Sequence, residues 1–180
     1  MNTKKLIFYI VGVIILVIII WFAFANKIIA PQREITNFDE CVAAGNPVQE
    51  SYPERCMTKD GKSFTQDIGN EMEKSDLIKA NSPRPNTIVG NTIEIKGEAR
   101  GAWFFEASFP IKLVDENGNE LATTIAQAKS GWMTEEFVPF EAIIKFQNPE
   151  IKKADLMLLK DNPSGLPEND DFLRIPIRFE

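Results

Sequence analysis

Residues 103–113 read WFFEASFPIKL, and every second residue from Trp103 onward is apolar. The positions between are mostly polar, or are the strand-breaking Pro110. A side-chain period of two is what a strand with one buried and one solvent-facing side requires. The alternation therefore predicts a strand over residues 103–113, with Trp103 on its buried face and Phe104 on its outer face. It indicates antiparallel β structure for the C-terminal half.

Further strand candidates recur around this stretch, with turn signals between them. One turn signal is the Asn-Gly dipeptide inside Asp115–Asn119, the strongest short-range mark of a β-hairpin. We therefore predict that residues 86–180 form an all-β domain, an immunoglobulin-like β-sandwich, with a small barrel as the alternative. The other strand candidates are residues 92–99, 121–128, 138–146, 156–159 and 173–179.

The N-terminal segment is strongly apolar. Residues 6–25 carry no charge over twenty positions, enough for a helix across a hydrocarbon core of ~30 Å. Lys4 and Lys5 precede it, so the positive-inside rule keeps residues 1–5 in the cytoplasm. We expect a separate transmembrane helix that acts as a signal anchor in the cell membrane, with the C-terminal domain extracytoplasmic. The alternative is a signal peptide cleaved after Ala25.

The two cysteines lie outside the predicted β domain. After a spacer over residues 26–40, Cys41 and Cys56 enclose fourteen residues. Two cysteines in an exported chain usually pair, so a disulfide is expected to staple a miniature element over residues 41–65. A redox-active pair, the alternative, would favour close C-x-x-C spacing. The polar stretch 66–85 then predicts a linker that ends in Pro83 and Pro85.

The composition disfavours several functional classes. The chain has no histidine, so histidine triads and histidine-based zinc sites are excluded, and two cysteines are too few for a structural zinc site. Apart from Lys4 and Lys5 it carries 18 basic against 26 acidic residues, which disfavours nucleic acid as a partner. We expect no enzyme activity, no cofactor, no metal site and no catalytic residue.

Five residues are candidates for an interaction surface. Arg100 and Glu106 are the charges nearest the aromatic cluster. They form a structural ion pair or a hydrogen bond to a turn, or else a polar pair that binds a ligand. Trp132 follows a glycine in a turn-like stretch, so it either contacts a ligand or packs half-buried at the end of the domain. Phe104 and Phe137 fall on outward faces of their strands, where two aromatic rings would form an apolar patch. The alternative is that both rings pack under a loop.

One acidic loop is a candidate calcium site. Residues 115–120 superficially resemble a calcium loop, but Gly118 stands fourth and no glutamate closes position twelve. A plain hairpin turn accounts for this segment.

Three strings carry a resemblance to a known family: GEARGAWFFEASFPIKLVDENG (97–118), SGWMTEEFVPFEA (130–142) and DNPSGLPENDD (161–171). They resemble the immunoglobulin-like domain of bacterial spore germination proteins, over roughly residues 78–180. The resemblance implies a non-enzymatic β-sandwich of envelope proteins without an agreed ligand, in bacteria that include non-sporulating species. Residues 41–64 resemble a short two-cysteine module that accompanies this domain in some anchored proteins.

These features together predict a membrane-anchored binding or scaffolding protein of the bacterial envelope. Its partner is expected to be an envelope protein or cell-wall glycan near the membrane. The alternative is an accessory subunit of a larger membrane assembly for germination, secretion or proteolysis. A third hypothesis, a carboxylate-based glycan hydrolase, requires two acids that converge in a cleft.

Overall fold

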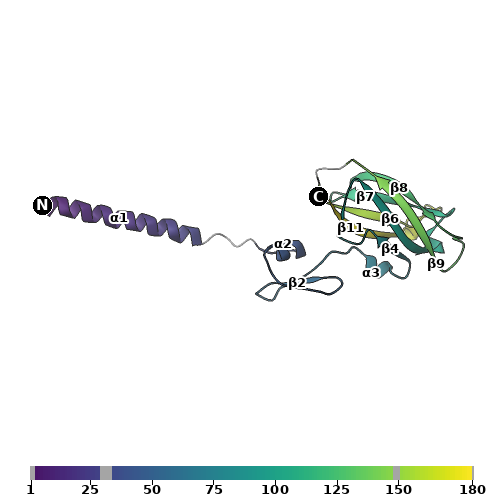
Figure 1. Cartoon of the computed structure of the whole chain (residues 1–180), viewed down its shortest axis with the longest axis horizontal. Helices are drawn as coiled ribbons and strands as arrows, with labels where there is room; N and C mark the ends of the chain where they lie inside the picture. The colour runs from purple at the N-terminus through teal and green to yellow at the C-terminus, as the bar shows by residue number, and fades with distance from the viewer. Residues whose placement is uncertain (1–2, 29–33, 148–150, 180) are drawn as a thin grey trace.

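The computed structural model describes residues 3–28, 34–147 and 151–179, and within helix α1 (Thr3–Ile28) it describes the side chains of residues 7 and 11–22. Part of the predicted cytoplasmic segment (residues 1–2) and of the predicted spacer (residues 29–33) lies outside this description. Figure 1 shows α1 at the N-terminal end of the chain. The side chains of residues 11–22 are exposed. In the part of the chain described, no helix combines the length and apolarity needed to cross a membrane.

The two-cysteine element comprises α2 (Phe38–Ala43) and strands β1 (Val48–Gln49), β2 (Arg55–Met57) and β3 (Ser63–Thr65). The strands form a small antiparallel sheet in the order β1-β2-β3. Cys41 of α2 and Cys56 of β2 form a disulfide, and both residues are fully buried. The predicted Cys41–Cys56 disulfide is therefore confirmed.

The β domain is an eight-stranded sheet with strand order β4-β6-β9-β8-β7-β10-β11-β5. All neighbours pair antiparallel except β11 and β5. Short helices α3 (Glu71–Lys74), η1 (Gly101–Trp103) and η2 (Pro167–Asn169) accompany it. The strands are β4 (Ile78–Ser82), β5 (Ile88–Val89), β6 (Thr92–Arg100), β7 (Ser108–Asp115), β8 (Glu120–Ala128), β9 (Phe137–Lys145), β10 (Lys153–Leu159) and β11 (Phe172–Phe179).

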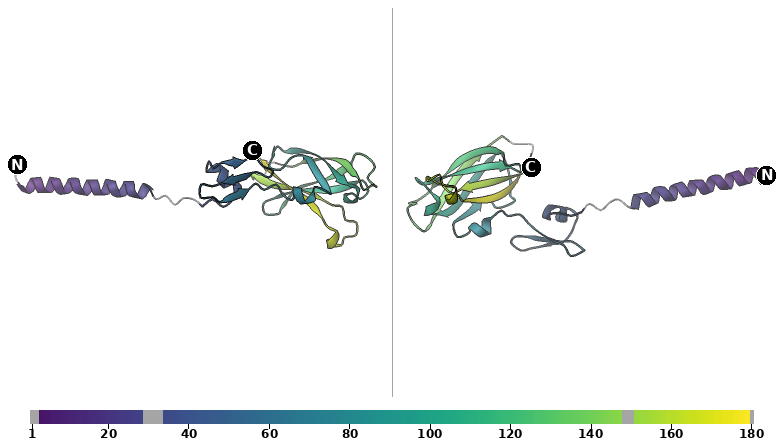
Figure 2. Two further views of the ribbon diagram at one scale, coloured as in Figure 1. Left: turned by 90° about the horizontal axis from the view of Figure 1, so that it is seen from below. Right: turned by 180° about the vertical axis from the view of Figure 1, so that it is seen from behind.

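This sheet curls into two layers around one core (Figures 1 and 2). Strands β8 and β9 pair through only two residue pairs, whereas β6 and β9 pair through nine. Across the core, the ring of Phe109 in β7 meets that of Phe140 in β9 edge-on, with centroids 4.9 Å apart. The predicted mostly-β, sandwich-like architecture is therefore confirmed for the C-terminal domain.

The strand predicted over residues 103–113 is wrong in its first half. Strand β7 begins only at Ser108, because Glu106 and Ala107 have positive φ angles of 49° and 61°. They form a tight turn in which Phe105 and Ser108 exchange two backbone hydrogen bonds. The alternation therefore shifts before the turn: Phe104 is buried (4% exposed) and Phe105 is 42% exposed. Trp103 is buried as expected, but it lies in η1.

The predicted linker over residues 66–85 needs a second correction. Within it, Ile78–Ser82 forms edge strand β4, which pairs with β6. Ile78 and Ala80 are buried in the core, whereas Asn81 and Ser82 after them are exposed. The β domain therefore begins before residue 86.

Candidate functional site

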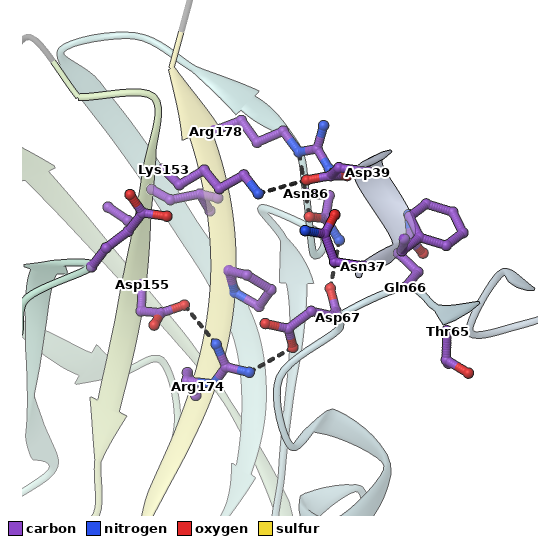
Figure 3. A pocket seen from close by; sticks show the side chains of 15 residues that line it. Asn37, Asp39, Thr65, Gln66, Asp67, Asn86, Lys153, Asp155, Arg174 and Arg178 are labelled. Atoms are coloured by element: carbon purple, nitrogen blue, oxygen red, sulfur yellow. Dashed lines mark hydrogen bonds and ion pairs between the residues drawn. The ribbon is translucent and has the colours of Figure 1, made fainter. Parts of the chain in front are cut away.

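A polar pocket of about 420 Å³ lies between the two-cysteine element and the β domain (Figure 3). The two-cysteine element and the segment after it contribute Asn37, Phe38, Asp39, Thr65, Gln66 and Asp67. The β domain contributes Asn86, Lys153, Asp155, Arg174, Pro176 and Arg178, among others. Most of these side chains carry hydrogen-bonding groups, so the pocket is suited to a polar occupant.

Strand β11 supplies the cationic wall of the pocket. Its alternate residues Leu173, Ile175 and Ile177 are buried in the core, which turns the side chains between them outward. Arg174 donates to Asp155 Oδ1 of the neighbouring β10 at 3.0 Å and to Asp67 Oδ1 at 2.5 Å. Arg174 thus joins the β domain to the segment that follows β3.

Asp39 makes the corresponding contact from α2. Its Oδ1 accepts a hydrogen bond from Arg178 at 2.7 Å, and its Oδ2 accepts one from Lys153 at 2.5 Å. Lys153 and Arg178 stand directly opposite each other on β10 and β11, where two like charges repel. The single carboxylate of Asp39 offsets this repulsion and holds α2 against the domain.

Asparagines complete the junction through the backbone. Asn70 accepts from the N–H of Arg174 at 2.7 Å and donates to the carbonyl of Phe172 at 2.9 Å. Asn86, at φ 64°, donates to the carbonyl of Asp67 at 2.7 Å. Asparagine tolerates a positive φ better than most residues. These bonds fix the segment after β3 along the outer edge of β11.

A second polar cluster also joins the two modules. The hydroxyl of Tyr52 donates to Glu71, and Arg84 donates both to Glu71 and, at 2.8 Å, to the Tyr52 hydroxyl. Burial and the adjacent Glu71 carboxylate raise the pKa of Tyr52 to about 12, so Tyr52 stays protonated. The two modules are therefore joined at two places.

The pKa values of the pocket carboxyl groups are shifted in different directions. Burial opposes ionisation of Asp39 and Asp67, but hydrogen bonds from Lys153 and Arg178 to Asp39, and from Arg174 to Asp67, outweigh it. The pKa values of both carboxyls therefore lie below their ordinary value. Burial raises the pKa of Asp155 despite its bond to Arg174.

The residues singled out from the sequence lie elsewhere. Arg100 donates to the carbonyls of Asp76 and Glu135, each at 3.1 Å, and forms an ion pair with Glu136 at 3.8 Å. Glu106 lies in the turn before β7, and the described residues show no ion pair between it and Arg100. A binding role for these two residues stays a prediction. Arg100 and Lys79 both lie 4.1 Å from the ring centroid of Phe137.

The apolar patch predicted from Phe104 and Phe137 is wrong. Phe104 packs edge-on against Phe109 inside the core, because the turn at Glu106 reverses the expected face. Trp132 is half-buried against the core, beside Met133, which is 86% exposed. A binding role for Trp132 or Phe137 stays a prediction.

The acidic loop at Asp115 is a hairpin turn. Asp115 Oδ1 accepts from the backbone N–H groups of Asn117 and Asn119 at 2.9 and 2.8 Å. Gly118 adopts a φ of 82°. In the described ranges of the chain, no three His, Cys, Asp or Glu side chains gather as a metal ion requires.

The two β layers around one core define the C-terminal domain as an immunoglobulin-like domain, and a disulfide-bonded element precedes it. The family described as the immunoglobulin-like domain of bacterial spore germination matches residues 77–165. Residues 77–165 therefore belong to this family, which confirms the resemblance seen in the sequence. Comparisons with curated proteins and with solved structures give no match.

Proposed function

We propose that the chain is a membrane-anchored, non-enzymatic binding or scaffolding protein of the bacterial envelope. It presents the β domain and the two-cysteine element together, outside the cytoplasm, to an envelope protein or a cell-wall glycan. The observation that carries the proposal is the buried Cys41–Cys56 disulfide in an element that Asp39 ties to the β domain.

The disulfide supports the extracytoplasmic location. Disulfides persist in oxidising compartments and are rare in the cytoplasm. The two-cysteine element is too small to hold a core of its own, so it depends on the bridge between Cys41 and Cys56. A chain that needs this bridge for its shape is suited to the outer side of the membrane.

The N-terminal segment supports the anchor. Residues 6–25 are uncharged and follow Lys4 and Lys5. In α1, the apolar side chains of residues 11–22 are exposed. A contiguous apolar surface of this kind calls for contact with lipid or with another protein. An anchor would also keep the β domain at high local concentration near its partners.

The paired charges of the pocket support a structural or binding role. Lys153, Arg174 and Arg178 each lie in an ion pair with an aspartate of the junction. Their charges are already neutralised and hold the two modules together. The family match is in keeping with a non-enzymatic domain.

The test uses the full-length protein in bacterial cells. We expect it in the membrane fraction, released by detergent but not by alkaline carbonate. A membrane-impermeant maleimide should label Cys41 and Cys56 in intact cells only after treatment with a membrane-impermeant reductant. In the control, a cleavable secretion signal replaces residues 1–25, and the protein should be oxidised and soluble. Thiols that are free and become labelled only after lysis would contradict the proposal.

A further inference from the structure

We infer that the pocket between the two-cysteine element and the β domain binds an uncharged oligosaccharide rich in hydroxyl and amide groups. The inference rests on the proposed function, because it assigns a site and a ligand class to a protein proposed to face the cell wall. The pocket volume of about 420 Å³ lies in the range in which proteins bind small molecules.

The charge pattern of the pocket favours a neutral ligand. Each cation already has a carboxylate partner: Arg174 pairs with Asp67 and Asp155, while Lys153 and Arg178 share Asp39. An anionic ligand would have to displace one of these ion pairs and leave a charge without its partner, which is costly, and it would also meet the carboxylate of Glu116 in the pocket lining. A ligand with hydroxyl and amide groups leaves every pair intact.

The same side chains retain hydrogen-bonding capacity. Within the described residues, Asp67 and Asp155 receive their hydrogen bonds at Oδ1, so each Oδ2 stays available as an acceptor. Arg178 donates through Nε to Asn86 and through one terminal nitrogen to Asp39, and its other terminal nitrogen stays available as a donor. Hydroxyl groups both donate and accept, so a sugar ring matches this mixture of groups.

The pocket also offers apolar faces of limited size. Phe38 and Pro176 line it and are half-buried. A sugar ring presents C–H groups on its faces and hydroxyl groups around its rim. It can therefore pack against Phe38 or Pro176 while its rim reaches the polar side chains. A wholly apolar ligand would leave the polar groups of the pocket desolvated without partners.

Asp155 distinguishes a ligand site from a purely structural junction. Its ion pair with Arg174 lies within the β domain, between β10 and β11. The contacts to the two-cysteine element run instead through Asp39 and Asp67. A change at Asp155 therefore alters the pocket while these contacts remain.

The experiment is a calorimetric titration of the full-length, oxidised protein in detergent. The probe is the neutral tetramer of N-acetylglucosamine, and an oligogalacturonate of equal length is the anionic comparison. We expect binding of the neutral tetramer and no heat from the anionic one. The Asp155→Asn variant should bind the tetramer about tenfold more weakly, because the amide NH2 group cannot accept a hydrogen bond as the carboxylate oxygen that it replaces does.

Glu98→Gln is the matched control. Glu98 pairs with Lys79 at 3.4 Å across β4 and β6, outside the pocket, and its variant should bind like the original protein. Equal thermal unfolding of Asp155→Asn and Glu98→Gln would show that both variants fold. The inference is overturned if the neutral tetramer does not bind, if Asp155→Asn binds as tightly as the original protein, or if only the anionic oligomer or a charged peptide binds. Failure of binding in a correctly anchored, oxidised protein would leave the proposed function standing.

Discussion

Asp39, in the first turn of α2, accepts a hydrogen bond from Arg178 at 2.7 Å, although 139 residues separate the two. An acidic residue is favourable at that end of a helix even before it meets a cation. The same carboxylate also bonds to Lys153. One side chain thus combines helix stabilisation with the docking of the two-cysteine element on β10 and β11.

Loss of the Asp39 carboxylate should loosen this docking. We expect Asp39→Asn to weaken the docking of the two-cysteine element by up to about 1 kcal/mol of free energy for each partly exposed ion pair that it removes. The stability of the β domain itself should change little. Hydrogen exchange should become faster in residues 38–65 and stay unchanged in β6 and β9. Glu50→Gln, an exposed change in the same element, is the control. Exchange at the original rate in Asp39→Asn would contradict the assigned contact.

Acid should separate the modules before it unfolds the β domain. The pKa values of Asp39 and Asp67 are lowered in the folded protein. Their contribution to the stability of the junction is therefore present above the ordinary pKa of 3.8 and is lost as the pH falls below it. Asp155 acts in the opposite sense, because its raised pKa favours the protonated folded state. It therefore does not drive the acid release.

Hydrogen exchange between pH 6 and pH 3 measures this effect. Residues 38–65 should lose protection below about pH 3.8, while β6, β9 and β11 keep theirs. The Asp39→Asn variant should show a smaller change with pH than the original protein. Simultaneous loss of protection in both modules would refute a separable ionic junction.

Gly97 is required by close packing inside the β domain. A Cβ atom at this position would lie 2.2 Å from the carbonyl oxygen of Lys79 and 2.6 Å from Cζ of Phe140. Gly97→Ala should therefore destabilise the β domain by more than about 2 kcal/mol. Gly90→Ala, where a Cβ atom would meet nothing within 4 Å, is the control. Thermal unfolding compares the two, and equal melting temperatures would contradict the packing.

The turn at Glu106 leaves Phe104 buried and Phe105 partly exposed. Phe104→Ser should destabilise the β domain by about 3 kcal/mol or more, because it removes a buried ring that packs against Phe109. Phe105→Ser should change stability far less, since this side chain is 42% exposed. Urea unfolding of the two variants measures the difference. The simple alternation over residues 103–113 predicts the reverse order.

Local patterns were sufficient to predict most of the β domain. In β6, β9 and β11 the apolar residues alternate without interruption, and each strand is found with the expected buried face. The Asn-Gly signal likewise marked the turn between β7 and β8. The turn at Glu106 and Ala107 gave no such signal, because neither residue favours a positive φ. Strand β4 was missed because only Ile78 and Ala80 are buried in a polar stretch.

The pocket could not be found from the sequence. Its charged residues come from α2, from the segment after β3 and from two strands of the β domain, so no local spacing connects them. In the sequence, Asp39 is an ordinary residue of the predicted spacer. The alternation in the sequence predicts that Arg174 and Arg178 face solvent, and both are indeed on the outer face of β11. Only the docking of the two modules brings these side chains together.

The most direct test compares sugar binding before and after reduction of Cys41–Cys56. The bridge stabilises its loop by about 3 kcal/mol in the chain-entropy model, so reduction should release the wall that carries Phe38 and Asp39. Calorimetry with the neutral N-acetylglucosamine tetramer should show binding to the oxidised full-length protein and at least a tenfold loss after reduction. A Cys41→Ser/Cys56→Ser variant should behave like the reduced protein. Equal affinity in the oxidised and reduced forms would contradict a pocket built jointly by the two modules.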